Sequence, residues 1–162
     1  LADVLFRGED ASENQKALTA EQVGLEFEID GANDDYAYSS QYEDVAMLFE
    51  EVMMKYHFGI DRELAYTEPS PDAQFCNDYT IRWGARFRTG LPLIQSRAEF
   101  VVQELLNKSD VSDYIAVLPN SQLMSSGENW CNIQSLSAKA KGETIDRSGE
   151  LIRPDNIYRD HR

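Results

Sequence analysis

The stretch between Ser39 and Gly59 constrains the fold most, because its apolar side chains recur at steps of three and four residues. The series comprises Tyr42, Val45, Ala46, Phe49, Val52, Met53 and Tyr56. This spacing places them on one face of an α-helix, and such a face has to be buried. Ser39 or Ser40 can accept from the first free backbone N–H groups, and Gly59 is suited to end the helix. We therefore predict one long helix here, with further apolar residues burying it on more than one side.

Two later segments also show helical spacing. A helix is predicted to start at Pro92, with an apolar stripe of Ile94, Ala98, Val101, Val102, Leu105 and Leu106. Asp110 to Leu118 is predicted to add a third, short helix. Helices therefore account for most of the predicted secondary structure.

Strands are predicted where apolar and polar residues alternate. One such segment carries Val23, Leu25, Phe27 and Ile29, and a second runs from Tyr79 to Phe87 with Gly84 as a weak point. Glu68 to Asp72 holds two prolines in three residues, which predicts a turn or loop. The fold class that follows is mainly α with minor β (α+β).

Length and charge limit the number of domains and the class of partner. The chain has 162 residues, enough for one domain, which we place at residues 1–136, followed by a polar C-terminal tail at 137–162. Its 15 Lys and Arg face 29 Asp and Glu, a formal charge of −14. Nucleic acid is excluded as a partner, because binding to phosphates depends on cationic side chains. No run of eighteen apolar residues occurs, so no membrane span is predicted.

The two cysteines, Cys76 and Cys131, lie 55 positions apart. In an exported protein such a pair is most simply one disulfide, whereas in a cytosolic protein it is two buried thiols. Neither cysteine has the spacing of a metal site. We favour the disulfide.

Glu43 and Tyr36 are the candidate functional residues. A zinc hydrolase needs three protein ligands and an open fourth position for water. When two ligands come from one helix, the third comes from another element, and a carboxylate at the start of a buried helix suits that task. Glu43 is such a carboxylate. Tyr36, seven residues earlier, places a phenol where it could donate a hydrogen bond to an oxyanion formed at zinc.

The segment from Asp35 to Phe49 resembles the second half of gluzincin-type zinc metallopeptidases, most closely those similar to anthrax lethal factor. The similarity lies in Tyr-Ala, a polar turn, and Glu-Asp-x-Ala-x-x-Phe. It implies that Glu43 is the third Zn²⁺ ligand and that Tyr36 stabilises the oxyanion during hydrolysis of a peptide or protein substrate. It also implies the helical C-terminal subdomain of a zincin-like fold. The protein would be an exported bacterial one, periplasmic or secreted.

The chain departs from this pattern in two ways. It has no His-Glu-x-x-His motif, since His57 and His161 are the only histidines and neither has a partner four residues away. We expect that motif upstream, in an N-terminal portion of the same protein, because this chain alone is not catalytically complete. In addition, Met47 stands where many relatives have an acidic residue.

Simpler interpretations stand beside each of these. Glu43 and Asp44 suit the positive end of a helix dipole, and Tyr36 suits packing beside the helix. His57 suits a structural position near the helix C-terminus. Asp30 to Glu43 lacks the residues of an EF-hand loop, which leaves only a non-canonical cation site.

Two further alternatives concern the arginines and the function as a whole. Arg82, Arg86 and Arg88 either form a basic face for an anionic ligand or pair with local carboxylates. As a whole, the chain is either part of a peptidase or a non-catalytic exported binding domain on a zincin-like scaffold. The missing histidines and Met47 favour the second of these.

Overall fold

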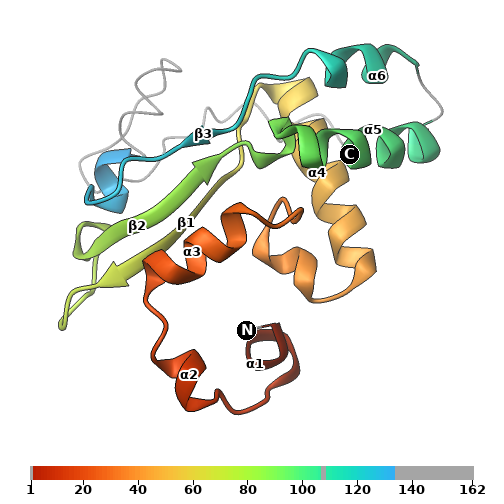
Figure 1. Cartoon of the computed structure of the whole chain (residues 1–162). Coiled ribbons are helices and arrows are strands. Elements are labelled where there is room, and N and C mark those ends of the chain that lie inside the picture. The colour runs from red at the N-terminus through yellow and green to blue at the C-terminus, as the bar shows by residue number, and fades with distance from the viewer. Residues whose placement is uncertain (1, 107–108, 134–162) are drawn as a thin grey trace, which may run out of the picture.

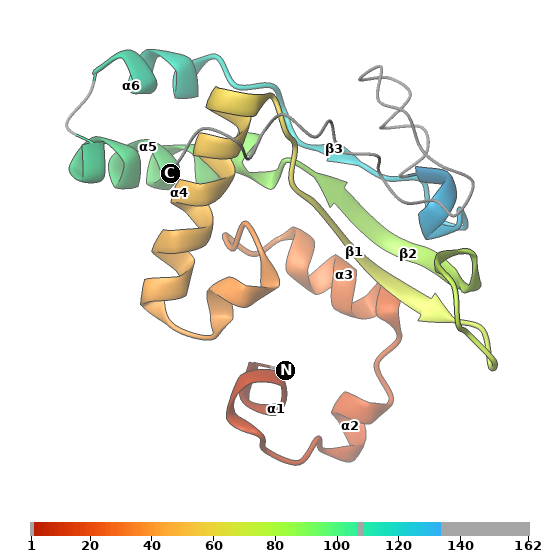
Figure 2. The same ribbon diagram turned by 180° about the vertical axis from the view of Figure 1, so that it is seen from behind.

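The computed structural model describes residues 2–106 and 109–133. Its elements are α1 (Ala2–Arg7), α2 (Glu13–Lys16), α3 (Ala20–Glu28), η1 (Asp35–Tyr38), α4 (Gln41–Phe58), β1 (Glu63–Pro69), η2 (Cys76–Asp78), β2 (Tyr79–Arg86), η3 (Arg88–Gly90), α5 (Pro92–Leu106), α6 (Ser109–Ala116) and β3 (Gln122–Leu123). The helices α4, α5 and α6 gather at one end (Figure 1). The sheet extends away from them, and α3 lies along it (Figure 2). The predicted class, mainly α with minor β, is confirmed.

The long helix predicted between Ser39 and Gly59 is α4. Ser40 is its N-cap, and the Ser40 hydroxyl accepts from the Glu43 backbone N–H at 3.2 Å. Gly59 ends the helix in the left-handed conformation, with φ of 65°, which a residue without a Cβ adopts at little cost. The local signals for the two helix ends therefore agree with the tertiary structure. The predicted stripe does not, because Tyr42, Val45, Ala46 and Tyr56 are exposed, whereas Leu48 and Glu51, outside that stripe, are buried with Val52.

α4 packs with α5 and α6 around the larger hydrophobic core. Its buried members are Leu48, Val52, Phe87, Ile94, Ala98, Val101, Val102, Val111, Ile115 and Leu118. The predicted α5 stripe contributes four of them, but its last two positions differ, because Leu105 is exposed and Leu106 is only half-buried. Complete burial of a Leu, Ile or Val side chain contributes about 1.5–3 kcal/mol, so this core is the main source of stability at the helical end.

The strand predicted at Val23–Ile29 is wrong, because these residues form α3 and the turn that follows it. Thr19 and Gln22 make a reciprocal capping box that starts the helix. Within the helix, Gly24 and Phe27 face the sheet, whereas Leu25 is 52% exposed and Ile29 is 83% exposed. Burial therefore follows the helical step from residue 24 to 27, and the alternation of apolar residues is incidental.

The sheet is antiparallel in the order β1-β2-β3. The strand predicted from Tyr79 is confirmed as β2. β1 was not predicted, and it extends into the segment expected to be a turn, with Glu68 opposite Thr80 and Pro69 opposite Tyr79. Pro69 is tolerated there because it is the last residue of β1, which pairs on one side only within the described part of the chain.

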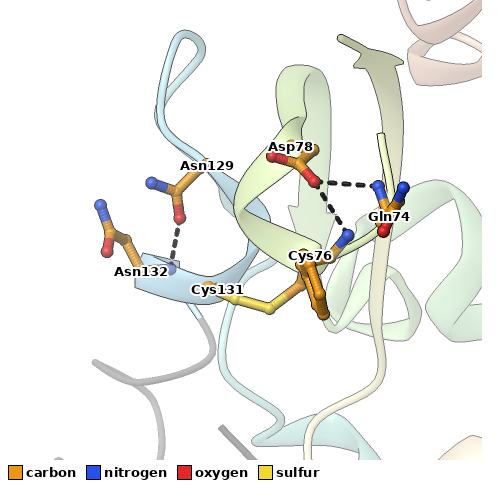
Figure 3. The surroundings of a disulfide bond; sticks show 7 residues. Gln74, Cys76, Asp78, Asn129, Cys131 and Asn132 are labelled. Carbon is orange, nitrogen blue, oxygen red and sulfur yellow. Dashed lines mark hydrogen bonds between the residues drawn. A yellow bond between two sulfur atoms is a disulfide. The ribbon is translucent and has the colours of Figure 1, made fainter. Parts of the chain in front are cut away.

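The predicted disulfide joins Cys76 and Cys131, with Cα atoms 5.2 Å apart. It ties η2, which leads into β2, to the helical turn that starts at Trp130 (Figure 3). The Asp78 carboxylate accepts from the backbone N–H groups of Gln74 and Phe75, both at 2.9 Å, which closes the loop around the bond. The predicted tail at 137–162 lies outside the described residues.

No helix in the described parts of the chain combines the length and the apolar character that a bilayer crossing demands.

Candidate functional site

Tyr36 lies on η1, the short helical turn that precedes α4. Asp34 caps this turn, and its carboxylate accepts from the Tyr36 backbone N–H at 2.8 Å. The Tyr36 side chain is 46% exposed, and its ring meets the Phe6 ring of α1 edge-on at 5.5 Å. Within the described residues, the Tyr36 hydroxyl has no hydrogen-bond partner. The Tyr36 ring is therefore held by packing, and its hydroxyl can donate a hydrogen bond to another molecule.

Glu43 lies in the first turn of α4 and is half-buried. Its carboxylate has no hydrogen-bond or ion-pair partner in residues 2–106 and 109–133. The adjacent Asp44 differs, because its carboxylate pairs with Arg97 of α5 at 2.7 Å. Of the two predicted first-turn acids, Asp44 therefore links α4 to α5. The Glu43 carboxylate, at the start of the same helix, makes no such link within the described residues.

These residues do not make a complete metal site. Across the described chain, no group of three or more His, Cys, Asp or Glu side chains is arranged to hold a metal ion. His57, in the last turn of α4, is exposed and lies against the Tyr56 ring at 4.9 Å. The residues described here therefore cannot hold a zinc ion by themselves, because Glu43 offers a single carboxylate.

A buried polar cluster near α4 was missed by sequence reasoning. Glu51, only 4% exposed, accepts from the Asn33 side-chain amide at 3.0 Å and from the Thr89 backbone N–H at 3.4 Å. Burial raises the pKa of Glu51, and these hydrogen bonds oppose the rise. Glu51 therefore joins α4 to the loop before η1 and to η3. A signal was present, since Glu51 falls on the same helical face as Leu48 and Val52.

A second pair of acids, Asp34 and Asp35, lies at the start of η1. Asp34 is 1% exposed and pairs with Arg62 at 2.5 Å. Burial raises the pKa of Asp35 to about 6, with further contributions from the hydrogen bond to Asp34 and from its charge. A carboxyl group that titrates near 6 can exchange a proton close to neutral pH. Within the described residues, no side chain beside Asp35 indicates which substrate would give or take this proton.

A cavity of about 210 Å³ adjoins this cluster and has five acidic side chains in its wall: Asp34, Glu50, Glu51, Asp61 and Glu63. Each of these acids already has a partner. Arg62 pairs with Asp34 and lies 4.0 Å from Glu50. Lys55 pairs with Asp61, and Arg86 pairs with Glu63. The non-canonical cation site considered for the acidic stretch gains no support from this arrangement.

The three arginines near β2 do not form one basic face. Arg82 and Arg86 pair with Glu68 and Glu63, each at 2.5 Å, as the simpler alternative expected. Arg88 instead is 2% exposed and donates to the backbone carbonyls of Phe27, Asp30 and Ala32 at 2.8–3.0 Å. Its guanidinium also lies 4.2 Å from the centre of the Phe27 ring. Arg88 therefore anchors the end of α3 to η3.

No protein family, no curated protein and no solved structure matches this chain.

Proposed function

We propose that this chain supplies one zinc ligand, Glu43, and one oxyanion-stabilising phenol, Tyr36, to an exported zinc-dependent peptidase. The remaining ligands, two histidines, belong to a His-Glu-x-x-His segment upstream of Leu1. The observation that carries the proposal is the half-buried Glu43 carboxylate, which has no partner in the described chain. Leaving a partly buried carboxylate unpaired is costly, so a partner from outside these residues would stabilise it.

Each residue has one role in this proposal. Zinc, when bound, would lower the pKa of a bound water and polarise the substrate carbonyl. The Glu43 carboxylate would hold one coordination position of the metal. The Tyr36 hydroxyl, at the exposed end of a ring held against Phe6, would donate to the oxygen on which negative charge develops. The disulfide supports the exported location, because such bonds persist in oxidising compartments.

Metal content tests the role of Glu43. A longer protein that includes the coding sequence upstream of Leu1 is expressed, and its zinc is measured by plasma mass spectrometry. We expect about one zinc per chain in the unchanged protein and loss of zinc in Glu43→Ala, because a missing ligand opens the site. Glu50→Ala is the matched control, since Glu50 is an exposed acid on the same helix. Retention of zinc by Glu43→Ala, or an upstream sequence without His-Glu-x-x-His, contradicts the proposal.

Peptide hydrolysis tests the role of Tyr36 separately. We expect Tyr36→Phe to keep its zinc and to lose about 10²–10³-fold in kcat, the usual effect of removing one oxyanion donor. The phenyl ring preserves the contact with Phe6, so folding should not change. An unchanged kcat would contradict the role of the hydroxyl and leave that of Glu43 intact.

A second candidate function is a non-catalytic exported binding domain. Met47, one turn after Glu43 on α4, favours it, because an apolar side chain stands where the resemblance expects a second acid. The zinc measurement decides between the two, since this domain would hold no metal even with its upstream segment.

A further inference from the structure

β1 is the edge strand of the sheet in the described chain. β2 is paired on both of its sides, with β1 on one and with β3 and residues 124–129 on the other. β1 pairs with β2 only. The helix α3 packs on one face of this sheet, with Phe27 against Tyr66 and Trp83.

The hydrogen-bond pattern shows which groups of β1 point outward. The carbonyls of Gly84 and Ile81 accept from residues on the far side of β2, at 2.9 Å and 2.8 Å, so these two residues direct their polar groups away from β1. Their partners on β1 are Ala65 and Thr67, which therefore direct theirs away from β2. Neither backbone has a partner in residues 2–106 and 109–133. Two N–H and two C=O groups thus form an open ladder.

A shallow depression of about 500 Å³ extends from β1 to Trp130, which follows Asn129 on the other side of β2. Ala65 and Thr67 form part of its wall, and Phe75, Tyr79 and Trp130 add aromatic surface. Phe75 is 71% exposed and Tyr79 is 37% exposed, far more than packing in a core would leave. The disulfide between Cys76 and Cys131 fixes the loop of Phe75 to the turn that carries Trp130 (Figure 3).

This combination determines the kind of occupant. Unpaired strand groups are completed by another strand, and alternate side chains of that strand reach a pocket beside the edge. A second copy of this chain is disfavoured, because each copy carries a charge of −14. A basic segment is favoured for the same reason. We propose that the β1 edge binds an extended, basic segment of another protein by strand addition, with an apolar side chain in the depression.

The proposal goes beyond the zinc hypothesis, because strand addition at β1 requires no metal. Its test is therefore done in the presence of EDTA. The probe is a fluorescein-labelled decapeptide of alternating Lys and Val, and binding is measured by fluorescence anisotropy. We expect saturable binding of this peptide, and at least tenfold weaker binding of two relatives: a Glu-Val decapeptide and a Lys-Pro decapeptide, which carries the same charge but cannot pair as a strand.

Thr67→Pro removes one outward N–H while the ladder to β2 stays intact. We expect it to weaken binding of the Lys-Val peptide about fivefold to tenfold, the worth of one hydrogen bond. Thr67→Val is the matched control, because it keeps the N–H and the size of the side chain. Phe75→Ala should weaken binding by a similar factor, and Phe100→Ala, at an exposed Phe on α5, should not.

Amide hydrogen exchange on the unchanged protein keeps the test independent of variant folding. We expect the peptide to slow exchange at Ala65 and Thr67 in particular. Equal binding by Thr67→Pro and Thr67→Val, unchanged exchange at both amides, or equal affinity for the Lys-Pro peptide would overturn the proposal. Concentration-dependent dimerisation that protects the same two amides would also overturn it, with a second copy as the occupant.

Discussion

Among single residues, Asp35 and Glu51 carry the clearest consequences of burial. The pKa of Asp35 is raised to about 6 and that of Glu51 is also raised, so the folded protein binds protons more readily than the unfolded chain does. These two carboxyl groups therefore contribute stability below their unfolded pKa values, and that contribution is lost as pH increases from about 4 to about 6. We expect Asp35→Asn to gain stability relative to the unchanged protein as pH increases over this range, measured as the difference between their urea midpoints. Asp10→Asn removes the same charge from an exposed position, and an equal gain there would contradict this assignment.

The bridging role of Glu51 leads to a second residue-scale prediction. Glu51→Ala leaves the Asn33 amide and the Thr89 N–H buried without their acceptor, so we expect a loss of about 2–4 kcal/mol in the free energy of unfolding. Glu51→Gln keeps one acceptor oxygen and should lose less. Urea denaturation measures both variants, and equal losses would show that the two hydrogen bonds contribute little.

At the scale of elements, the contact between α3 and β2 depends on a glycine. A Cβ added at Gly24 would lie 2.2 Å from the Trp83 Cβ, so α3 can approach β2 only without a side chain there. We expect Gly24→Ala to destabilise the fold by about 1–3 kcal/mol or more, even though Ala favours helices. Gly31→Ala is the control, because its Cβ would find only ordinary contacts at 3.8 Å. Indole fluorescence during urea titration reports both variants, and similar midpoints would contradict the close packing.

At the scale of the whole molecule, the disulfide joins two segments that lie 55 residues apart. Closing a loop of that length stabilises a protein by about 4 kcal/mol in the chain-entropy treatment. We expect the Cys76→Ser, Cys131→Ser double variant to lose stability of this order, as measured by urea unfolding without reductant. The unchanged protein should show no reactive thiol after denaturation, and two reactive thiols would contradict the bond.

Much of the element order was predictable from local patterns. α4, α5 and β2 have strong apolar periodicity, and the caps Ser40 and Gly59 define where α4 begins and ends. The two first-turn acids were also visible, but their sequence positions are adjacent and equivalent. Only the tertiary structure distinguishes them, because Arg97 of α5 pairs with Asp44, whereas Glu43 has no partner among the described residues.

By itself, the sequence determined where α4 and α5 lie, the strand with clear alternation and the pairing of the only two cysteines, since these depend on short-range spacing and on chemistry. The tertiary structure alone decided that residues 20–28 are helical, because contact with Trp83 selects the face that carries Gly24 and Phe27. It also decided the burial of Glu51 and Arg88 and the open edge of β1. Those features depend on neighbours that lie far away along the chain, which no local pattern encodes.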